Sequence, residues 1–177
     1  MATRALRILA AVLTLQVAVL PRAAHTDNLA PDAVKAGFVY NFTKFVEWPS
    51  GVLPAGGSMQ LCVLGQALDG RLVPLHGRIS QGREIRVRNV SAGSDLTSCH
   101  VLFVAESEER RMGSVLNAVS GNPVLTISDI GDFAESGGMI GLAVRNEKVT
   151  FTVNLPATRA AGLRTSAQLL RLGRVLQ

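Results

Sequence analysis

The chain has 177 residues and a formal net charge of +5 at pH 7. Three of its arginines (Arg4, Arg7 and Arg22) lie among the first 24 residues, so the rest of the chain carries 5 − 3 = +2. No tract of Lys and Arg interleaved with aromatic residues follows, which argues against nucleic-acid binding. About 150 residues remain after the first 24, the usual size of one domain with one sizeable core.

The beginning of the chain has the pattern of an export signal. Two arginines precede an apolar run from Ile8 to Leu20, which is too short to span a bilayer comfortably, and small residues follow it. Residues 1–24 are therefore predicted to be a signal peptide, and residues 25–177 an exported domain in the periplasm. Arg22 stands where a small residue is preferred before the cleavage point, so a retained anchor stays open as the alternative.

The first predicted element of the exported part is an amphipathic helix that runs from Pro31 to Trp48. Proline suits the first turn of a helix, and Pro49 ends this one because it cannot continue the hydrogen-bond ladder. The residues expected to form the inward stripe recur at helical spacing: Val34, Phe38, Asn41, Phe42, Phe45 and Trp48. The residues expected on the opposite side are Tyr40, Thr43, Lys44 and Glu47.

Four predicted strands follow, at Met59–Leu64, Arg83–Val90, Val101–Ala105 and Pro123–Ile127. The third is a continuous apolar run, as is typical of a strand covered on both faces. Between the strands, helices are predicted at residues 67–75 and at residues 107–120, the second of them capped by Ser107.

The last part of the chain predicts a hairpin and a closing helix. Met139–Val144 and Lys148–Val153 flank three polar residues, which favours a hairpin. Asn154 is placed to cap one final helix, with Leu163 on its inner side. Strands that alternate with helices predict an α/β fold: a single domain with a mixed, largely parallel sheet flanked by helices in a Rossmann-like layering.

The two cysteines, Cys62 and Cys99, both belong to the exported part. In an oxidising compartment a single disulfide is the expected state, and two buried thiols are the alternative. A zinc site is disfavoured, because His100 next to Cys99 and the distant His76 do not give the ligand spacing of such sites.

The sequence carries no catalytic motif that withstands scrutiny. Gly65–Leu72 has the glycine spacing of a phosphate loop, but Arg71 replaces the lysine that reaches the phosphates and Leu72 has no hydroxyl for magnesium. The G-x-S-x-G elbow of a serine hydrolase is absent as well. We therefore predict no catalytic residue, no cofactor and no bound metal.

One segment resembles a known family. Phe38–Pro49, with the pattern F-x-Y-N-F-x-K-F-x-E-W-P, resembles the opening helix of the YfiR family of periplasmic regulatory proteins. Further similar segments extend along nearly the whole exported part: Leu61–Gly65, Cys99–Phe103, Pro123–Asp129, Phe133–Ala134, Gly137–Ile140, Phe151–Leu155, Ala161–Leu163 and Leu169–Leu170. Their order and spacing together make the resemblance specific.

The resemblance implies a periplasmic α/β protein without enzymatic activity. The best-known members bind the periplasmic sensory region of an inner-membrane diguanylate cyclase and hold it inactive, so that cyclic di-GMP and biofilm formation stay low. The resemblance also implies sequestration by an outer-membrane lipoprotein and a homodimeric state. Cys62 and Cys99 fall where the family's structural disulfide lies, whereas this chain lacks the second disulfide of some members.

The candidates for partner binding, chosen from their chemistry, are Tyr40, Lys44, Glu47, Trp48 and Arg159. Trp48 also suits the core, since it falls on the inward stripe of the helix. The alternative function is a periplasmic sensor that binds a small ligand, in a pocket near the strand ends of the sheet.

Overall fold

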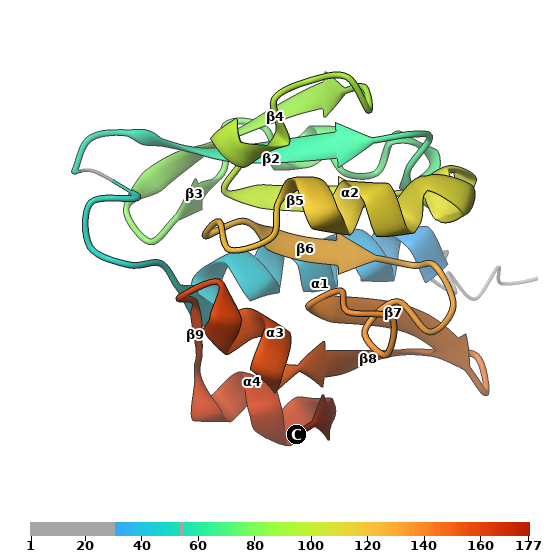
Figure 1. The fold of residues 1–177 in the computed structure, drawn as a ribbon. Coiled ribbons are helices and arrows are strands. Elements are labelled where there is room, and N and C mark those ends of the chain that lie inside the picture. Colours follow the sequence, from blue (N-terminus) through green and yellow to red (C-terminus); the bar gives the residue numbers. More distant parts are fainter. Residues whose placement is uncertain (1–30, 54) are drawn as a thin grey trace, which may run out of the picture.

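The computed structural model describes residues 31–53 and 55–177, so the predicted signal peptide lies outside the described residues. A central sheet has the strand order β10-β8-β7-β6-β5-β2-β4-β3 (Figure 1). Its strands are β2 (Ser58–Leu64), β3 (Ile79–Ser80), β4 (Arg83–Val90), β5 (Val101–Val104), β6 (Leu125–Ser128), β7 (Ile140–Arg145), β8 (Lys148–Asn154) and β10 (Arg174–Leu176). Among the described residues, no helix is both long enough and apolar enough to cross a membrane.

The strand pairing confirms the predicted mixed, largely parallel sheet. Antiparallel pairing joins β3 to β4 and β7 to β8, and the other neighbours in the sheet pair in parallel. The hairpin of β7 and β8 was expected from the sequence, and so were β2, β4, β5 and β6 within a few residues at their ends.

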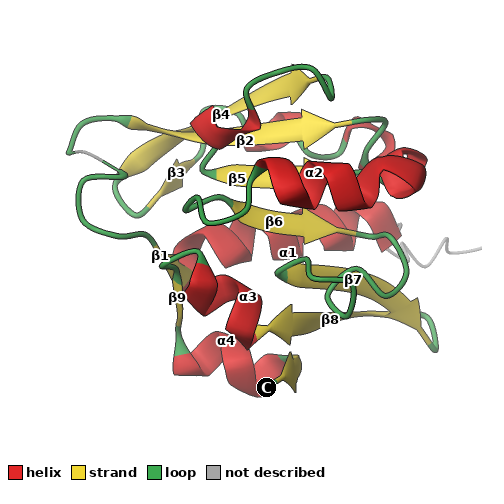
Figure 2. Ribbon diagram, in the orientation of Figure 1, coloured by secondary structure: helices red, strands yellow, loops and turns green. Residues whose placement is uncertain are grey.

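Helices cover both faces of the sheet, as predicted. Side chains alternate along β2, so that Leu61 and Val63 enter one core while Cys62 and Leu64 enter a second one. Helix α1 (Pro31–Phe45) packs on the first core and α2 (Met112–Ala118) on the second, on opposite sides of the sheet in Figure 2. This arrangement is the Rossmann-like layering expected from the sequence.

Helix α1 confirms the predicted element, but it ends at Phe45 and not at Trp48, because Val46 and Glu47 form a short strand that pairs with residues 164–165. The structure also corrects the phase of its buried stripe. Thr43 is fully buried and Asn41 is exposed, the reverse of the prediction. The burial of Thr43 is tolerated because its hydroxyl bonds the Tyr40 carbonyl at 2.7 Å and the Ser80 hydroxyl at 2.8 Å. The aromatic side of the helix still faces the core, since Phe42 lies 5.1 Å from Phe151 between ring centroids.

The chain after Asn154 corrects the prediction of one closing helix. Asn154 does cap a helix, because its side chain accepts a hydrogen bond from the Ala157 N–H at 3.0 Å. This helix, α3 (Leu155–Ala160), ends before Gly162, whose φ of +73° is a left-handed conformation that no helix continues through. A short strand, β9 (Arg164–Thr165), and a further helix, α4 (Ala167–Leu172), follow it.

Two other predicted helices are shorter than expected. Residues 67–75 form two separate 3₁₀ turns, Leu68–Gly70 and Val73–Leu75. In the segment predicted to be one helix at 107–120, a 3₁₀ turn at Glu106–Arg111 precedes α2. Ser107 does not cap α2; its hydroxyl instead accepts a hydrogen bond from the Gln66 N–H at 3.2 Å.

A disulfide joins Cys62 on β2 to Cys99, which precedes β5, with a Cα–Cα distance of 5.9 Å. Both residues are buried in the second core, so the predicted disulfide is confirmed and the alternative of two buried thiols is wrong. The bridge closes a loop with a sequence separation of 37 residues. A disulfide that closes a loop of this length stabilises the fold by about 3–4 kcal/mol, because it lowers the conformational entropy of the unfolded chain.

The substitution Gly138→Ala tests the packing of the second core. A Cβ atom at Gly138 would overlap the ring of Phe133, which is 1% exposed and cannot move away. We expect a loss of about 1–3 kcal/mol in the free energy of urea unfolding, because overpacking forces neighbouring groups apart.

Gly113→Ala is the matched control, since Gly113 lies within α2 and nothing stands within 4 Å of an added Cβ atom. This change should leave stability equal or raise it by up to about 1 kcal/mol, through helix propensity. Equal stabilities of the two variants would contradict the packing described for Phe133.

Candidate functional site

The exposed end of α1 carries an aromatic ring in contact with two cations. The Tyr40 hydroxyl donates a hydrogen bond to the Ile79 carbonyl at 2.9 Å. Lys44 Nζ lies 4.1 Å from the centroid of the Tyr40 ring, and Arg78 Cζ lies 4.4 Å from it. Both distances are within the range of a cation–π interaction, so the two cations hold the ring in place.

The hairpin of β3 and β4 locks this end of the helix. Gln81, in the turn between the two strands, donates hydrogen bonds at 2.7 Å to the carbonyls of Thr43 and Val46. Carbonyls at the end of a helix have no hydrogen-bond donor within the helix, and the side-chain amide of Gln81 provides that donor. The buried bond between Thr43 and Ser80 adds a second tie. The end of α1 is therefore rigid relative to the sheet edge.

The edge strand that accepts the Tyr40 hydrogen bond carries an exposed apolar residue. Ile79, on the short edge strand β3, is 58% exposed although it is large and apolar. We call Tyr40, Lys44, Arg78 and Ile79 the Tyr40 patch. It combines an aromatic ring, two cations and an exposed aliphatic group, which are the side-chain types that anchor protein–protein interfaces.

Glu47 lies on β1 (Val46–Glu47), which pairs with β9. Its carboxylate accepts hydrogen bonds from Arg164 at 2.7 Å and 3.2 Å, and both side chains are exposed. An exposed ion pair adds little stability, so its groups remain available to a partner. The sequence prediction of one final helix after Asn154 missed this pairing, because Arg164 lies on the strand β9 instead.

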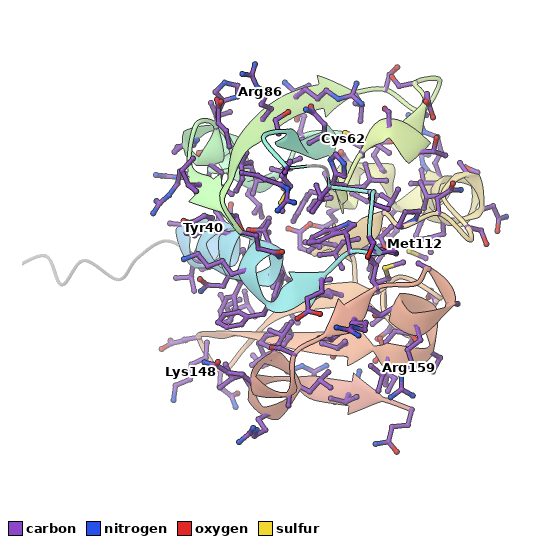
Figure 3. The ribbon with its side chains drawn as sticks, turned by 90° about the vertical axis from the view of Figure 1, so that its left-hand side faces the viewer. Tyr40, Cys62, Arg86, Met112, Lys148 and Arg159 are labelled. Atoms are coloured by element: carbon purple, nitrogen blue, oxygen red, sulfur yellow. A yellow bond between two sulfur atoms is a disulfide. The ribbon has the colours of Figure 1, made fainter. Side chains whose placement is uncertain are left out.

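The remaining two candidates lie apart from the patch. Trp48 packs against the first core and donates from its ring nitrogen to the His100 carbonyl at 3.2 Å. Arg159 is exposed on α3, and Figure 3 places it on a different side of the molecule from Tyr40. The structure thus brings Tyr40 and Lys44 together and separates them from Arg159.

The sequence prediction also missed Arg78, Ile79 and Gln81, because the strand in this segment, Ile79–Ser80, is only two residues long. One signal was present. Ile79 is a lone large apolar residue among polar ones between Gly77 and Gly82, and no periodic pattern accounts for it.

His100 is a half-buried histidine that fastens the segment after β1 to the sheet. Its Nδ1 atom accepts from the Gln60 N–H at 2.9 Å, so the proton is on Nε2, which donates to the Val52 carbonyl at 3.1 Å. Burial lowers the pKa of His100 below its ordinary value; the bond to Val52 opposes this shift, and the charge of Arg83 adds to it.

This lowered pKa predicts how stability depends on pH. The unfolded chain binds a proton at His100 more readily than the folded one. The contribution of neutral His100 to the free energy of unfolding is therefore full above about pH 6.5 and is lost as the pH falls below it. We expect His100→Asn, which keeps an acceptor near Gln60 but does not titrate, to reduce the fall in urea stability between about pH 7.5 and about pH 5.5.

His76 provides the control for this measurement. It is exposed, and its Nδ1 atom also accepts from a backbone N–H, that of Val87 at 3.2 Å. His76→Asn removes an exposed histidine in the same way and leaves His100 intact, so it is the reference against which His100→Asn is compared. If His100→Asn shows the same fall in stability as His76→Asn, His100 is not the group responsible.

Comparison with known proteins identifies the family. The family model for YfiR/HmsC-like proteins matches residues 32–174, most of the chain. The chain belongs to the YfiR/HmsC-like family. The match contains the whole Tyr40 patch and both cysteines, and it confirms the resemblance found in the sequence. Membership in the YfiR/HmsC-like family fits a periplasmic regulatory protein.

A solved structure shares the fold of this YfiR/HmsC-like chain. It is a conserved domain protein from Vibrio cholerae, with a TM-score of 0.58 and 8% sequence identity. The similarity covers 84% of this chain and 61% of the Vibrio chain, so the present chain spans less than two thirds of that protein. At this low identity the similarity shows the fold alone.

Proposed function

We propose that this protein is a non-enzymatic periplasmic regulator that binds the sensory region of an inner-membrane diguanylate cyclase and represses it. Repression would lower cyclic di-GMP and biofilm formation. Family membership supports the regulatory role. The observation that carries the proposal is the Tyr40 patch, where two cations hold a tyrosine ring whose hydroxyl is bonded to the backbone of the exposed Ile79.

The energetics of repression are within reach of such a surface. A repressor must bind the inactive conformation of its partner more tightly than the active one. A shift from mostly active to mostly inactive needs a difference of about 5 kcal/mol. Two or three well-placed anchors supply this amount in many interfaces, and tyrosine and arginine are prominent among them.

The rigidity of the patch also supports the proposal. Ordering a mobile side chain on binding costs about 0.5–1.5 kcal/mol for each one. The Tyr40 ring is already fixed by its hydrogen bond to Ile79 and by the two cations, and the helix end is fixed by Gln81. The partner therefore meets a surface that is largely preorganised.

Within the proposed interface, we assign the central role to Tyr40 and Lys44. Glu47 would contribute at the edge through its pair with Arg164, and Trp48 would act indirectly by holding the end of β1 against the core. Arg159 lies outside this surface. The homodimer and sequestration by an outer-membrane lipoprotein stay predictions from the family resemblance.

Cellular cyclic di-GMP tests the proposed function. We expect its level to rise when the gene is deleted and to fall when the gene is overexpressed, because the repressor sets the fraction of inactive cyclase. An unchanged level in both strains, with the protein confirmed to be exported and folded, would contradict the proposal.

Charge reversal tests the Tyr40 patch. In the deletion strain, Lys44→Glu and Arg78→Glu should each restore repression less well than the unaltered gene, through partner binding weakened about tenfold. Their thermal stability should fall little, since the cation–π contact at an exposed site contributes about 0.5–1 kcal/mol.

Arg110→Glu is the control for charge reversal, because Arg110 is an exposed arginine in the turn before α2, away from the patch. It should restore repression fully. A loss of repression with Arg110→Glu equal to that with Lys44→Glu would place the interface elsewhere.

A further inference from the structure

A cavity of about 660 Å³ opens at the carboxyl ends of β2 and β4. Its volume is in the range of small-molecule sites. The apolar part of its wall comes from Val63 and Leu72, which are buried, and from Val73, which is 61% exposed. An exposed valine beside a hollow of this size leaves apolar surface that a ligand can cover.

The polar part of the wall has unused hydrogen-bonding capacity. Gln66, Asp69 and Asn89 line the cavity and are exposed, and their side chains make no hydrogen bond or ion pair with the described residues. Asp69 is the charged group of this wall, and the described residues that line the cavity include no Lys, Arg or His. A phosphate or carboxylate would therefore meet a carboxylate with no cation to offset it.

The position of the cavity follows from the sheet topology. In the sheet, β4 lies on one side of β2, and β5, the next parallel strand along the chain, lies on its other side. The strand order therefore reverses at β2. Ligands of such sheets usually bind where the order reverses, here between β2 and β5. Ser107 closes that place, since its Oγ lies 2.5 Å from where a Cβ of Gly65 would be. The open space lies instead between β2 and β4.

The loop that forms the rim is held in an unusual conformation. Leu68 and Asp69 both have φ of +45°, in the left-handed region that residues with a side chain seldom adopt. Such strain is found at ligand clamps, where the surrounding structure over-determines the backbone. Here the conformation occurs at Asp69, a residue that lines the cavity.

We propose that this cavity binds a small organic cation, a primary amine with a short aliphatic body. The ammonium group would lie at Asp69, and the body would cover Val73, the exposed residue of the apolar wall. The amides of Gln66 and Asn89 would bond further polar groups of the ligand. This inference goes beyond the regulatory function and gives a chemical class to the alternative of a small-ligand sensor.

The test compares three probes with one aliphatic body and different head groups: isoamylamine, isoamyl alcohol and isovalerate. Each is titrated into the purified protein, and backbone amide shifts are followed by NMR. We expect saturable shifts from the amine at residues 65–73 and at Asn89. The alcohol should bind about fivefold more weakly than the amine, because it cannot form the ion pair with Asp69. Isovalerate should bind more weakly still, because its carboxylate is repelled by Asp69.

Two aspartates make a matched pair for this test. Asp69→Asn should weaken amine binding about fivefold, and asparagine tolerates the left-handed backbone at this position. Asp132 is also exposed, with φ of +51°, and does not line this cavity, so Asp132→Asn should bind as the unaltered protein does.

Val73→Lys provides a second variant that does not depend on the loop conformation. It places a cation on an exposed position of the wall and should also weaken amine binding. The proposal is overturned if the amine causes no saturable shifts, if isovalerate binds equally well, or if Asp69→Asn binds as Asp132→Asn does. No partner protein is present, so the outcome is independent of the test of repression.

Discussion

The packing of α1 on the sheet determines what this protein can present to a partner. Phe42 is fully buried against Phe151, and the buried Thr43 hydroxyl is satisfied by Ser80. A rotation of the helix would break the bond to Ser80, which contributes about 0.5–1.5 kcal/mol, and would move the ring of Phe42 out of the core. The helix is thus fixed in one orientation, and this orientation turns Tyr40 and Lys44 toward β3 and the solvent.

The same helix links the two sites that we propose. Its outer side carries the Tyr40 patch, and the turn at Leu68–Gly70, which forms the rim of the amine cavity, packs against it. A ligand that changed the free energy of this turn would act on an element in contact with the partner surface. Coupling of this kind requires that the ligand bind two arrangements of the turn with different affinity.

The sequence predicted the parts of the fold that depend on local pattern. It did not predict features that depend on contacts between residues far apart in the chain. The apolar run at Val101–Ala105 predicts a buried strand because few other elements tolerate it. The predicted buried stripe of α1 was wrong at Thr43, which was expected to face solvent and is buried. Nothing near Thr43 in the sequence shows that Ser80 would bond its hydroxyl. The Tyr40 patch was half predicted for the same reason: Lys44 lies one helical turn from Tyr40, whereas Arg78 and Ile79 come from a distant hairpin.

Photo-crosslinking in living cells tests the central claim most directly, namely that the Tyr40 patch meets a diguanylate cyclase. A photoreactive amino acid is placed at Lys44 and, in a second strain, at Arg110, and the crosslinked proteins are identified by mass spectrometry. The account predicts that position 44 captures an inner-membrane protein with a diguanylate cyclase domain and that position 110 does not. Capture of that protein from position 110 alone, with both variants exported and folded, would contradict it.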